Sequence, residues 1–375
     1  MEPRNAFVNF GRTLDNSRPL EYTRPWKLLY FGDHSTMANL ASTDEHGLED
    51  LLSEPHDATR KALCGISGDV AILGAGGKMG PTLAMMLRKA APDKKIYAVS
   101  RFNDQRARSR IEGAGVEIVE ADLLDEAVYD RLPDVPNVFY LAGMKFGATG
   151  NQPLTWAMNA YMPALVARRY HRSRIVAFST GNVYPFTDLQ SGGSREQDVP
   201  GPVGEYAQSC LARERIFQHF SGRFGTPVTL IRLNYSNEPR YGIIVDLTLK
   251  ILHGEPVDVT MGAVNLIWQA DANNYIIRAM SIAKSPPAIL NVTGPETVAV
   301  RDLAGRIGKL LGKQPHFVSQ EAATALLSNA STCFELFGRP AMTLDGMIGV
   351  IVPWVAAGKP VLGKPTKYGV RDGRF

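Results

Sequence analysis

An apolar run that breaks into a cluster of glycines constrains the fold of this chain more than any other feature. Residues 69–73 are mostly apolar, residues 74–80 contain four glycines, and residues 81–91 resume with helical spacing. The pattern predicts a strand, a tight turn and a helix. Glycine adopts backbone angles closed to other residues and lets a phosphate approach the main chain. An ordinary turn is the alternative, but the flanking strand and helix favour a turn that binds a dinucleotide.

Length and composition predict a globular, water-soluble protein. The chain has 375 residues, of which 45% are hydrophobic and 21% charged, enough for a large core and a smaller lobe. No apolar run approaches the roughly 20 residues of a membrane span, and residues 1–11 lack the apolar region of a signal peptide. We therefore expect a cytoplasmic protein that binds no membrane. The net charge of +4 is spread without a basic block, which argues against a nucleic-acid partner.

The number and spacing of the cysteines argue against a disulfide framework and against a metal cluster. Cys64, Cys210 and Cys333 are odd in number and lie far apart in the sequence. Neither a disulfide framework nor a metal cluster has such spacing, so we predict no metal site.

Residues 1–66 precede the first predicted strand and form an N-terminal extension. The segment is rich in aromatic side chains, which need burial, so we expect it to pack on the main domain or on a partner subunit. Within it the sequence predicts a short strand at residues 27–31 and helical pieces at residues 49–52 and 58–63.

Strand and helix patterns alternate after the first helix. The sequence predicts further strands and helices at residues 95–100, 107–114, 116–120, 123–132, 137–141, 153–170 and 174–178. Repeated units of this kind form a parallel sheet that is covered by helices on both faces. The predicted fold class is therefore α/β, with a Rossmann-type, doubly wound parallel sheet.

The end of the second strand bears on the choice of cofactor. In dinucleotide-binding folds an acidic residue about twenty positions after the glycines binds the adenosine ribose of NAD. This chain has Ser100 and Arg101 there instead. An arginine can pair with the 2′-phosphate of NADP, so we favour NADP and keep NAD as possible. A solvated surface arginine is the alternative.

Several motifs together match a known family. Gly74, Gly77 and Gly80 have Gly-x-x-Gly-x-x-Gly spacing, and Asp122 and Leu123 follow the third predicted strand. With these motifs the chain resembles the extended short-chain dehydrogenase/reductase superfamily and, within it, the NAD(P)-dependent epimerase/dehydratase family. The resemblance covers residues 68–338.

This resemblance implies where the cofactor binds. Asp122 and Leu123 match the pair that holds adenine, Ala142 and Gly143 match the segment beside the ribose, and Asn159 stands where the family often keeps an asparagine. The implied cofactor-binding residues are Gly74, Gly77, Lys78, Met79, Gly80, Arg101, Asp122, Leu123, Ala142, Gly143 and Asn159.

The resemblance also implies two domains. Residues 67–235 would form the NAD(P)-binding Rossmann domain, and residues 236–375 mainly a smaller α/β substrate domain. Residues 262–285 or thereabouts would return to the Rossmann domain, and a C-terminal arm would lie on the surface or on another subunit. Family members often form homodimers through two helices, which here would be residues 153–170 and 206–220.

Family chemistry needs a proton-exchanging tyrosine, a hydroxyl side chain that polarises the same substrate oxygen, and a lysine four residues after the tyrosine. Residues 179–184 resemble the strand-end motif and place Thr180 as the hydroxyl donor. Residues 204–210 resemble the tyrosine motif and place Tyr206 as the proton donor or acceptor. Position 210 would share a helix face with Tyr206, but it is a cysteine.

The missing lysine changes the expected chemistry. A lysine ammonium lowers the pKa of the tyrosine, and a neutral thiol does not. Lys145 is a second candidate, because a similar Ala-Gly-x-Lys segment in sugar-nucleotide 4-epimerases brings a lysine near the nicotinamide; a surface lysine is the alternative. Cys210 is either a nucleophile, which would need a nearby cation, or a small residue that faces the cofactor.

Three residues are expected to face the substrate, namely Asn182, Asn234 and Tyr235. Relatives that act on sugar nucleotides often grip the diphosphate with an arginine, and by alignment Val264 takes its place here. Arg240 is a candidate substitute, and a free sugar or sugar acid fits equally well.

These features predict an NAD(P)-dependent oxidoreductase or epimerase that acts by hydride transfer on a hydroxyl or carbonyl of a sugar-like small molecule. The alternative is a non-catalytic NAD(P)-binding redox sensor or scaffold that lost the active-site lysine. Because Thr180 and Tyr206 are present, we favour the enzyme.

Overall fold

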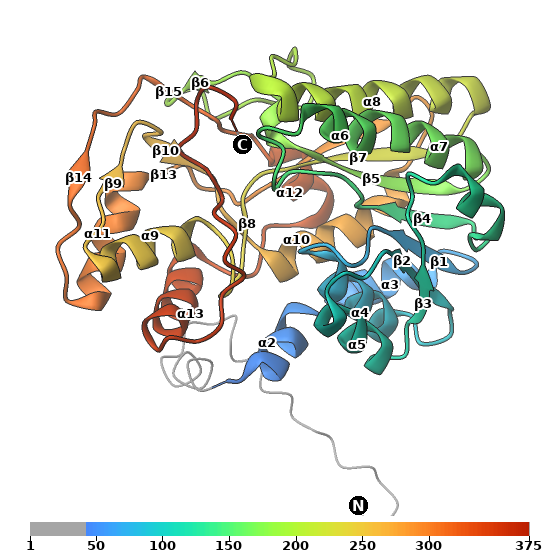
Figure 1. Ribbon diagram of the computed structural model, residues 1–375, viewed down its shortest axis with the longest axis horizontal. Coiled ribbons are helices and arrows are strands. Elements are labelled where there is room, and N and C mark those ends of the chain that lie inside the picture. Colours follow the sequence, from blue (N-terminus) through green and yellow to red (C-terminus); the bar gives the residue numbers. More distant parts are fainter. Residues whose placement is uncertain (1–42, 375) are drawn as a thin grey trace, which may run out of the picture.

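A seven-stranded parallel sheet forms the centre of the protein. The structure is a computed structural model, and it describes residues 43–374. The strand order is β12-β7-β5-β4-β1-β2-β3, and every pairing is parallel (Figure 1). The strands are β1 (Val70–Leu73), β2 (Ile96–Ser100), β3 (Glu117–Glu120), β4 (Asn137–Tyr140), β5 (Arg174–Thr180), β7 (Val228–Leu233) and β12 (Ala288–Val292). The predicted doubly wound α/β fold is confirmed.

Helices cover both faces of this sheet (Figure 1). On one face lie α4 (Gly80–Ala90), α5 (Gln105–Gly113) and α10 (Gln269–Arg278). On the other lie α6 (Gln152–Trp156), α7 (Met162–Arg169) and α8 (Gly204–Phe224). Along β1, Ile72 belongs to the first of these two cores, and Ala71 and Leu73 belong to the second. Since both faces are covered, β1 and β4 are buried throughout.

The described part of the N-terminal extension packs on its own chain. It forms α2 (Glu45–Leu52) and α3 (Asp57–Cys64), which match the two helical pieces predicted there. The Thr59 hydroxyl donates to Asn274 Oδ1 at 2.6 Å and so links α3 to α10. The strand predicted at residues 27–31 lies outside the described residues.

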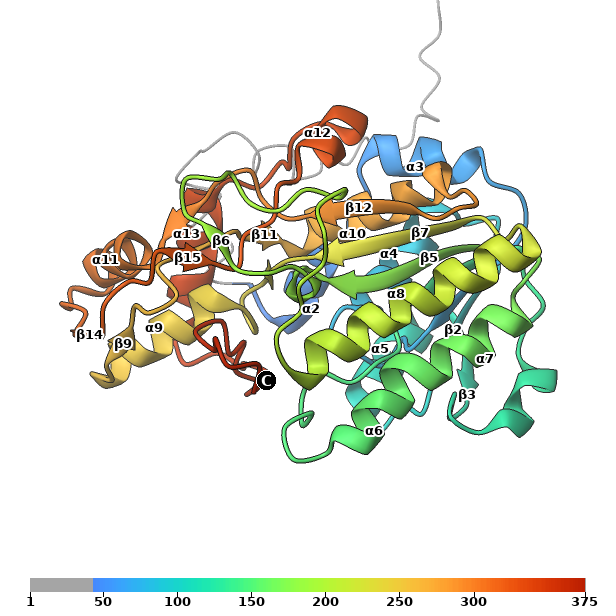
Figure 2. The same ribbon diagram turned by 90° about the horizontal axis from the view of Figure 1, so that it is seen from above.

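A second lobe lies beside the sheet (Figure 2). Its core is formed by α9 (Ile243–His253), α11 (Val300–Leu311) and α13 (Leu344–Ala356). The remaining short elements are β6 (Thr187–Asp188), β8 (Ser236–Asn237), β9 (Val257–Asp258), β10 (Ala263–Val264), β11 (Ile267–Trp268), β13 (Val298–Ala299), β14 (Phe317–Val318), β15 (Thr324–Ala325) and α12 (Ser331–Phe337), with 3₁₀ turns η4 (Gly181–Val183) and η5 (Ala279–Ile282). The domain boundaries given above stay a prediction.

Two predicted helices differ in the structure. The helix expected at residues 123–132 is shorter and is a 3₁₀ turn, η2 (Glu126–Arg131). Asp125 caps its start by accepting from Ala127 N at 3.0 Å, and Pro133 disfavours helical backbone at Leu132. The helix expected at residues 153–170 contains a π-helical turn, η3 (Ala157–Tyr161). Pro163 has no N–H to donate to the carbonyl of Asn159, which disrupts the α-helical ladder there. The wider turn holds the buried side chain of Asn159.

The C-terminal tail crosses both lobes of its own chain (Figure 1). Thr366 donates from its main-chain N and its hydroxyl to Asp246 Oδ2, at 2.8 and 2.6 Å. Further along, Arg371 Nη1 donates to the carbonyl of Thr324 at 2.6 Å. Gly373 packs so closely against Gly204, at the start of α8, that a Cβ on either would collide. The tail therefore covers the junction between the lobes, where sequence reasoning expected a surface or subunit arm.

A buried ion pair fastens α8 to the sheet. Arg232 on β7 contacts Glu214 on α8 through two hydrogen bonds, of 3.0 and 2.7 Å, and the Ser179 hydroxyl on β5 donates to the same carboxylate at 2.5 Å. The exposed fractions of the Arg232 and Glu214 side chains are 2% and 0%. Removal of one partner would leave an unpaired charge in the interior.

Glu214→Ala is therefore expected to lower the free energy of unfolding by about 3–5 kcal/mol. Denaturant titration followed by circular dichroism measures this change. Glu321→Ala is the matched control, since Glu321 pairs with Arg301 on the surface and such pairs contribute at most about 1 kcal/mol. Equal losses in the two variants would contradict the role given to the buried pair.

Candidate active site

A cavity opens beyond the carboxyl ends of β1, β5 and β7, where they face the second lobe. In this sheet the chain order reverses between β1 and β4, and ligands of doubly wound folds bind at such a switch point. The cavity is lined by Gly74, Gly77, Lys78, Met79, Gly80, Leu141, Lys145, Phe146, Phe178, Ser179, Thr180, Asn182, Tyr206, Leu233, Asn234, Tyr235, Ser236, Tyr241, Gly242, Ile243 and Thr366. Eleven of these residues are among those that the sequence predicted.

The glycine turn fits a dinucleotide pyrophosphate. Gly74 has a φ of +91°, and a Cβ there would lie 2.6 Å from the main-chain N of Ala142. A Cβ on Gly80 would collide with the carbonyl of Ala75. Because α4 begins at Gly80, the positive end of its dipole faces the cavity, together with the main chain of the glycine turn.

Lys78 leaves the glycine turn and reaches the second lobe. Its ammonium donates to the carbonyl of Ser236 at 3.0 Å and lies 4.5 Å from the centre of the Tyr241 ring. Burial lowers the pKa of Lys78 to about 7, and Glu238 opposes the shift. The charge of this lysine at neutral pH is therefore sensitive to a bound anion.

The residues predicted to hold the adenosine lie outside the cavity lining. Arg101 Nη1 is 3.7 Å from Asp122 Oδ2, and both side chains are about half exposed. Asp122 also accepts a hydrogen bond from the main-chain N of Leu124 at 3.0 Å, and Leu123 is buried. Arg101 and Asp122 thus lie together after the ends of β2 and β3.

Asn159 holds the loop that follows β4. Its Oδ1 accepts from the main-chain N of Met144 at 2.8 Å, and its Nδ2 donates to the carbonyl of Met144 at 2.9 Å. Gly143 lies directly against the side chain of Arg213, where a Cβ would collide. Ala142 is buried, and Lys145 of the same loop lines the cavity.

Thr180 and Tyr206 come together at the cavity. The Thr180 hydroxyl donates to Asn182 Oδ1 at 2.9 Å and accepts from Asn182 N at 3.2 Å. Tyr206 lies in the first turn of α8, and its hydroxyl is within hydrogen-bonding reach of Thr180 and Cys210. Burial raises the pKa of Tyr206 well above its ordinary value, Cys210 adds to the rise, and Arg213 opposes it. Tyr206 is therefore a neutral phenol when no ligand is bound.

Cys210 and Lys145 are two of the predicted catalytic residues. Burial raises the pKa of the Cys210 thiol, so it stays protonated near neutral pH, which favours the small neutral residue over the nucleophile. Burial lowers the pKa of Lys145 to about 8, with Cys210 and Asp246 opposing the shift. Lys145 therefore remains mostly cationic at neutral pH.

Two of the predicted substrate residues have unusual environments. Asn234 Nδ2 is buried and has no hydrogen-bond partner within residues 43–374. Tyr235 has a φ of +42°, a strained backbone conformation for a residue with a side chain, and such strain is common at binding sites. Both residues line the cavity, with Asn182 beside Thr180.

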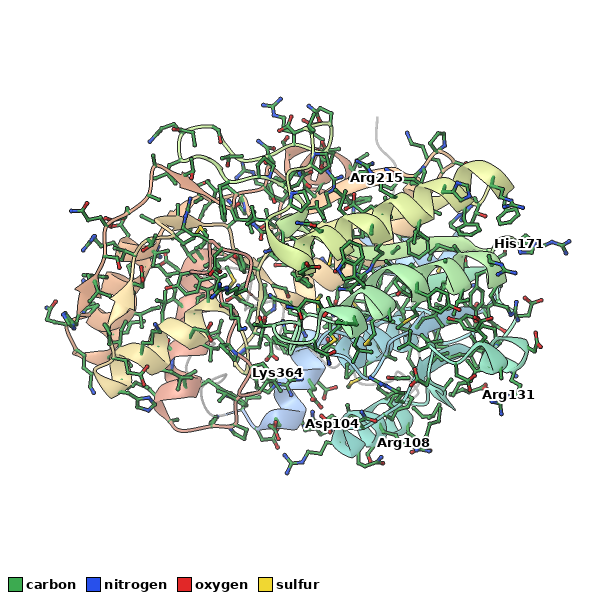
Figure 3. The ribbon with its side chains drawn as sticks, turned by 45° about the horizontal axis from the view of Figure 1, so that its top comes forward. Asp104, Arg108, Arg131, His171, Arg215 and Lys364 are labelled. Carbon is green, nitrogen blue, oxygen red and sulfur yellow. The ribbon has the colours of Figure 1, made fainter. Side chains whose placement is uncertain are left out.

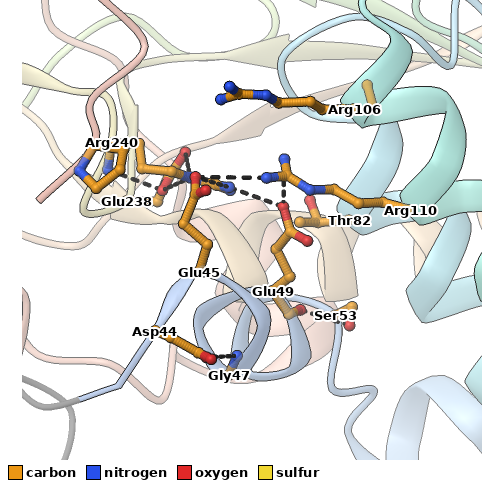
Figure 4. A network of polar contacts seen from close by, with 12 residues as sticks. Asp44, Glu45, Gly47, Glu49, Ser53, Thr82, Arg106, Arg110, Glu238 and Arg240 are labelled. Carbon is orange, nitrogen blue, oxygen red and sulfur yellow. Dashed lines mark hydrogen bonds and ion pairs between the residues drawn. The ribbon is translucent and has the colours of Figure 1, made fainter.

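Arg240 is not available to a substrate diphosphate. Its guanidinium contacts Glu238 at 3.1 Å and Glu49 at 2.8 Å (Figure 4). It does not line the cavity, and Val264 is completely buried. The expectation that Arg240 binds the diphosphate in place of the missing arginine is therefore wrong, because carboxylates that include Glu49 on α2 neutralise the Arg240 guanidinium.

Sequence reasoning missed several residues of the site. Ser236, Tyr241 and Thr366 line the cavity, and Arg213 lies buried beside Cys210 and Asn159. Other polar side chains of this part of the chain lie away from the site: Figure 3 shows Arg131 and His171 at the edge of the molecule. A signal for Arg213 was present, since residues 206, 210 and 213 share one face of a helix.

The described part of the chain holds no group of three or more His, Cys, Asp or Glu side chains placed to bind a metal ion, and its three cysteines are free. None of its helices has the length and apolar character that crossing a membrane requires.

The chain belongs to the NAD dependent epimerase/dehydratase family, whose model matches residues 70–262. The predicted membership is thereby confirmed, and the protein is an NAD(P)-dependent enzyme of the extended short-chain type. A search of curated protein sequences finds no match to the chain.

Solved structures share the fold. MoeE5 in complex with UDP-glucose and NAD is 22% identical, with a TM-score of 0.65 over 78% of this chain and 99% of MoeE5. UDP-glucuronic acid 4-epimerase from Bacillus cereus in complex with NAD is 16% identical, with a TM-score of 0.67 over 77% of this chain and 99% of its own. UDP-glucose 4-epimerase from Thermotoga maritima is also 16% identical, with a TM-score of 0.66 and the same coverage.

Lys78→Met is expected to weaken the binding of a nicotinamide dinucleotide about tenfold at pH 6, since it removes a cation that lines the cavity beside the glycine turn. Because the pKa of Lys78 is about 7, its ammonium is present below pH 7 and is lost above it. Titration calorimetry should therefore show a smaller difference between variant and parent at pH 8.5. Lys61 is exposed and serves as the control, since Lys61→Met should leave the affinity unchanged at both pH 6 and pH 8.5. An equal loss at both pH values would contradict this role.

Proposed function

We propose that this protein is an NAD(P)-dependent oxidoreductase or epimerase that acts on a hydroxyl or carbonyl of a sugar or sugar-derived molecule. The observation that carries the proposal is the meeting of Thr180 and Tyr206 at a cavity that the glycine turn also lines. A proton-transferring phenol, a second hydroxyl and a pyrophosphate-binding turn in one cavity suit hydride transfer to or from a carbinol carbon.

Each residue has a part in this reaction. A bound nicotinamide would supply the acceptor or donor of the hydride. Thr180 would hydrogen-bond the reacting oxygen and hold it beside Tyr206. Tyr206, a neutral phenol in the structure, would give its proton to a carbonyl oxygen during reduction, and its phenolate would take a proton from an alcohol during oxidation.

The lining of the cavity supports a polar, anionic substrate. Asn234 Nδ2 and Ser236 Oγ are buried without hydrogen-bond partners in the described chain, and sugar hydroxyls would supply such partners. Lys78 and Lys145 add positive charge to the same cavity. The anionic group of a sugar carboxylate, a sugar phosphate or a nucleotide-diphosphate sugar would bind to these two lysines. Relatives often use an arginine for this contact, and Val264 takes its place here.

The fold suggests how the active molecule assembles. Leu154, Trp156 and Tyr161 are large apolar side chains that are exposed on α6 and η3. These residues lie in one of the two helical segments from which the homodimer was expected. We propose a homodimer through these segments, and no partner other than the small-molecule substrate.

Tyr206→Phe is expected to lower turnover at least about 100-fold, because it removes the proton donor, and to change the affinity for NADP less than about twofold. Turnover is followed as a change in NADPH absorbance and by product analysis with UDP-sugars, sugar phosphates and uronic acids. Tyr97→Phe is the control, as Tyr97 lies on β2 and does not line the cavity. Full turnover in Tyr206→Phe would contradict the role of Tyr206 as proton donor. A parent protein that binds the cofactor but turns over none of these substrates would favour the non-catalytic sensor.

We further propose that NADP is the preferred cofactor, with NAD as the alternative. Arg101→Ser should weaken NADP binding about tenfold or more, since a charge-assisted hydrogen bond to the 2′-phosphate is lost. The affinity for NAD should stay within about twofold. The exposed Arg131, at the far end of the sheet, is the control. If Arg101→Ser left both affinities unchanged, Arg101 would be a solvated surface residue.

A further inference from the structure

Arg213 is a buried cation without a carboxylate partner. Its side chain is almost completely inaccessible, at 6% exposed, and within residues 43–374 it forms no ion pair. Nη1 donates to the carbonyl of Phe178 at 2.9 Å and Nη2 to Asn159 Oδ1 at 2.6 Å. Nε is buried and has no hydrogen-bond partner in the described chain. A buried charge without an ion pair is costly, although the nearby Glu214 and the Tyr140 ring, whose centre is 5.8 Å from the guanidinium carbon, offset part of this cost. Such charges are common at functional sites.

The position of Arg213 relates it to the missing lysine. Residues 206, 210 and 213 lie on one face of α8. Side chains on a helix lean toward its N-terminus, so the long arginine side chain reaches back toward Cys210. The amide of Asn159 contacts both side chains, since its Oδ1 accepts from Arg213 and its Nδ2 lies 4.0 Å from Cys210 Sγ. A lysine at position 210 would extend toward this same amide.

We propose that Arg213 supplies the positive charge that relatives place at position 210, and that it acts through Tyr206 as a positioning residue. The inference rests on the proposed function. When Tyr206 gives its proton to a substrate carbonyl oxygen, the O–H bond electrons stay on the phenolate, and the guanidinium stabilises that charge. When an alcohol is oxidised, its proton returns to the phenolate and the positive charge keeps the phenolate available.

The groups around Tyr206 leave few other sources of charge. Cys210 and Tyr140 are buried, and burial raises the pKa of both, so they are neutral. Glu214 is already paired with Arg232. Thr180 is a neutral hydroxyl. Lys145 acts on Cys210 from the loop after β4, whereas Arg213 acts on Tyr206 itself and lowers its pKa against the effect of burial.

The test replaces Tyr206 with 3,5-difluorotyrosine, whose phenol ionises at lower pH, and follows its titration by ¹⁹F NMR in the cofactor-free protein. Arg213→Gln should raise the pKa of the fluorinated residue by about one pH unit or more. Arg213→Lys should raise it less. The matched control is Arg215→Gln on the same helix, because Arg215 is exposed and bonded only to Gln218 within the described chain, and it should not move the titration.

A second variant separates charge from structure. In the double variant Arg213→Gln/Cys210→Lys, the pKa of the fluorinated residue should return to the parental value, since the lysine places a positive charge near Asn159. If Arg213 had only a structural role, a lysine at position 210 would not restore this pKa. If Arg213→Gln alone does not fold, the double variant and Arg213→Lys are compared with the parent by the same titration.

The outcomes are distinct. A pKa that Arg213→Gln leaves unchanged, or that Cys210→Lys does not restore, overturns the assignment of Arg213 without any use of turnover. A parent protein that binds the cofactor without turning over any of the sugar substrates would instead overturn the proposed function.

Discussion

The parallel direction of all seven sheet strands brings the chemistry of this protein to one edge. Since the carboxyl ends of the strands meet there, the glycine turn after β1, the loop after β4, Thr180 at the end of β5 and Asn234 after β7 become neighbours. These residues are far apart in the sequence. The second lobe and the C-terminal tail then cover this edge and contribute Ser236, Tyr241 and Thr366 to the cavity. The position of the site is thus determined by the topology of the sheet.

Helix α8 joins the sheet to the proposed chemistry through two buried arginine contacts. Arg232 and Glu214 fix the helix against β7 and β5, which determines where its first turn holds Tyr206. Arg213, one residue before Glu214, turns toward Asn159 and the loop after β4. The π-helical turn around Asn159 widens the neighbouring helix where this contact is made. In this arrangement the lack of a lysine at position 210 does not mean that the site lacks a buried cation.

The sequence was informative where the signal is local. Apolar runs and helical spacing predicted β1 to β5 and the helical segments between them, and glycine spacing predicted the turn at the cavity. Features that depend on distant residues were not predictable in this way. Arg240 is paired with Glu49, 191 residues away in the chain, so its removal from the site could not be read from its neighbours. The position of Thr366 depends likewise on Asp246, 120 residues away.

The most direct test of the central claim is to denature the freshly purified protein, identify any nucleotide that is released, and titrate the emptied protein with NADP, NAD and their reduced forms. The account predicts binding of a nicotinamide dinucleotide. Retained NAD or NADH would favour an epimerase that returns the hydride internally, and an empty site that binds NADPH would favour a reductase that exchanges its cofactor. If none of the four nucleotides binds, the enzyme proposed here is contradicted.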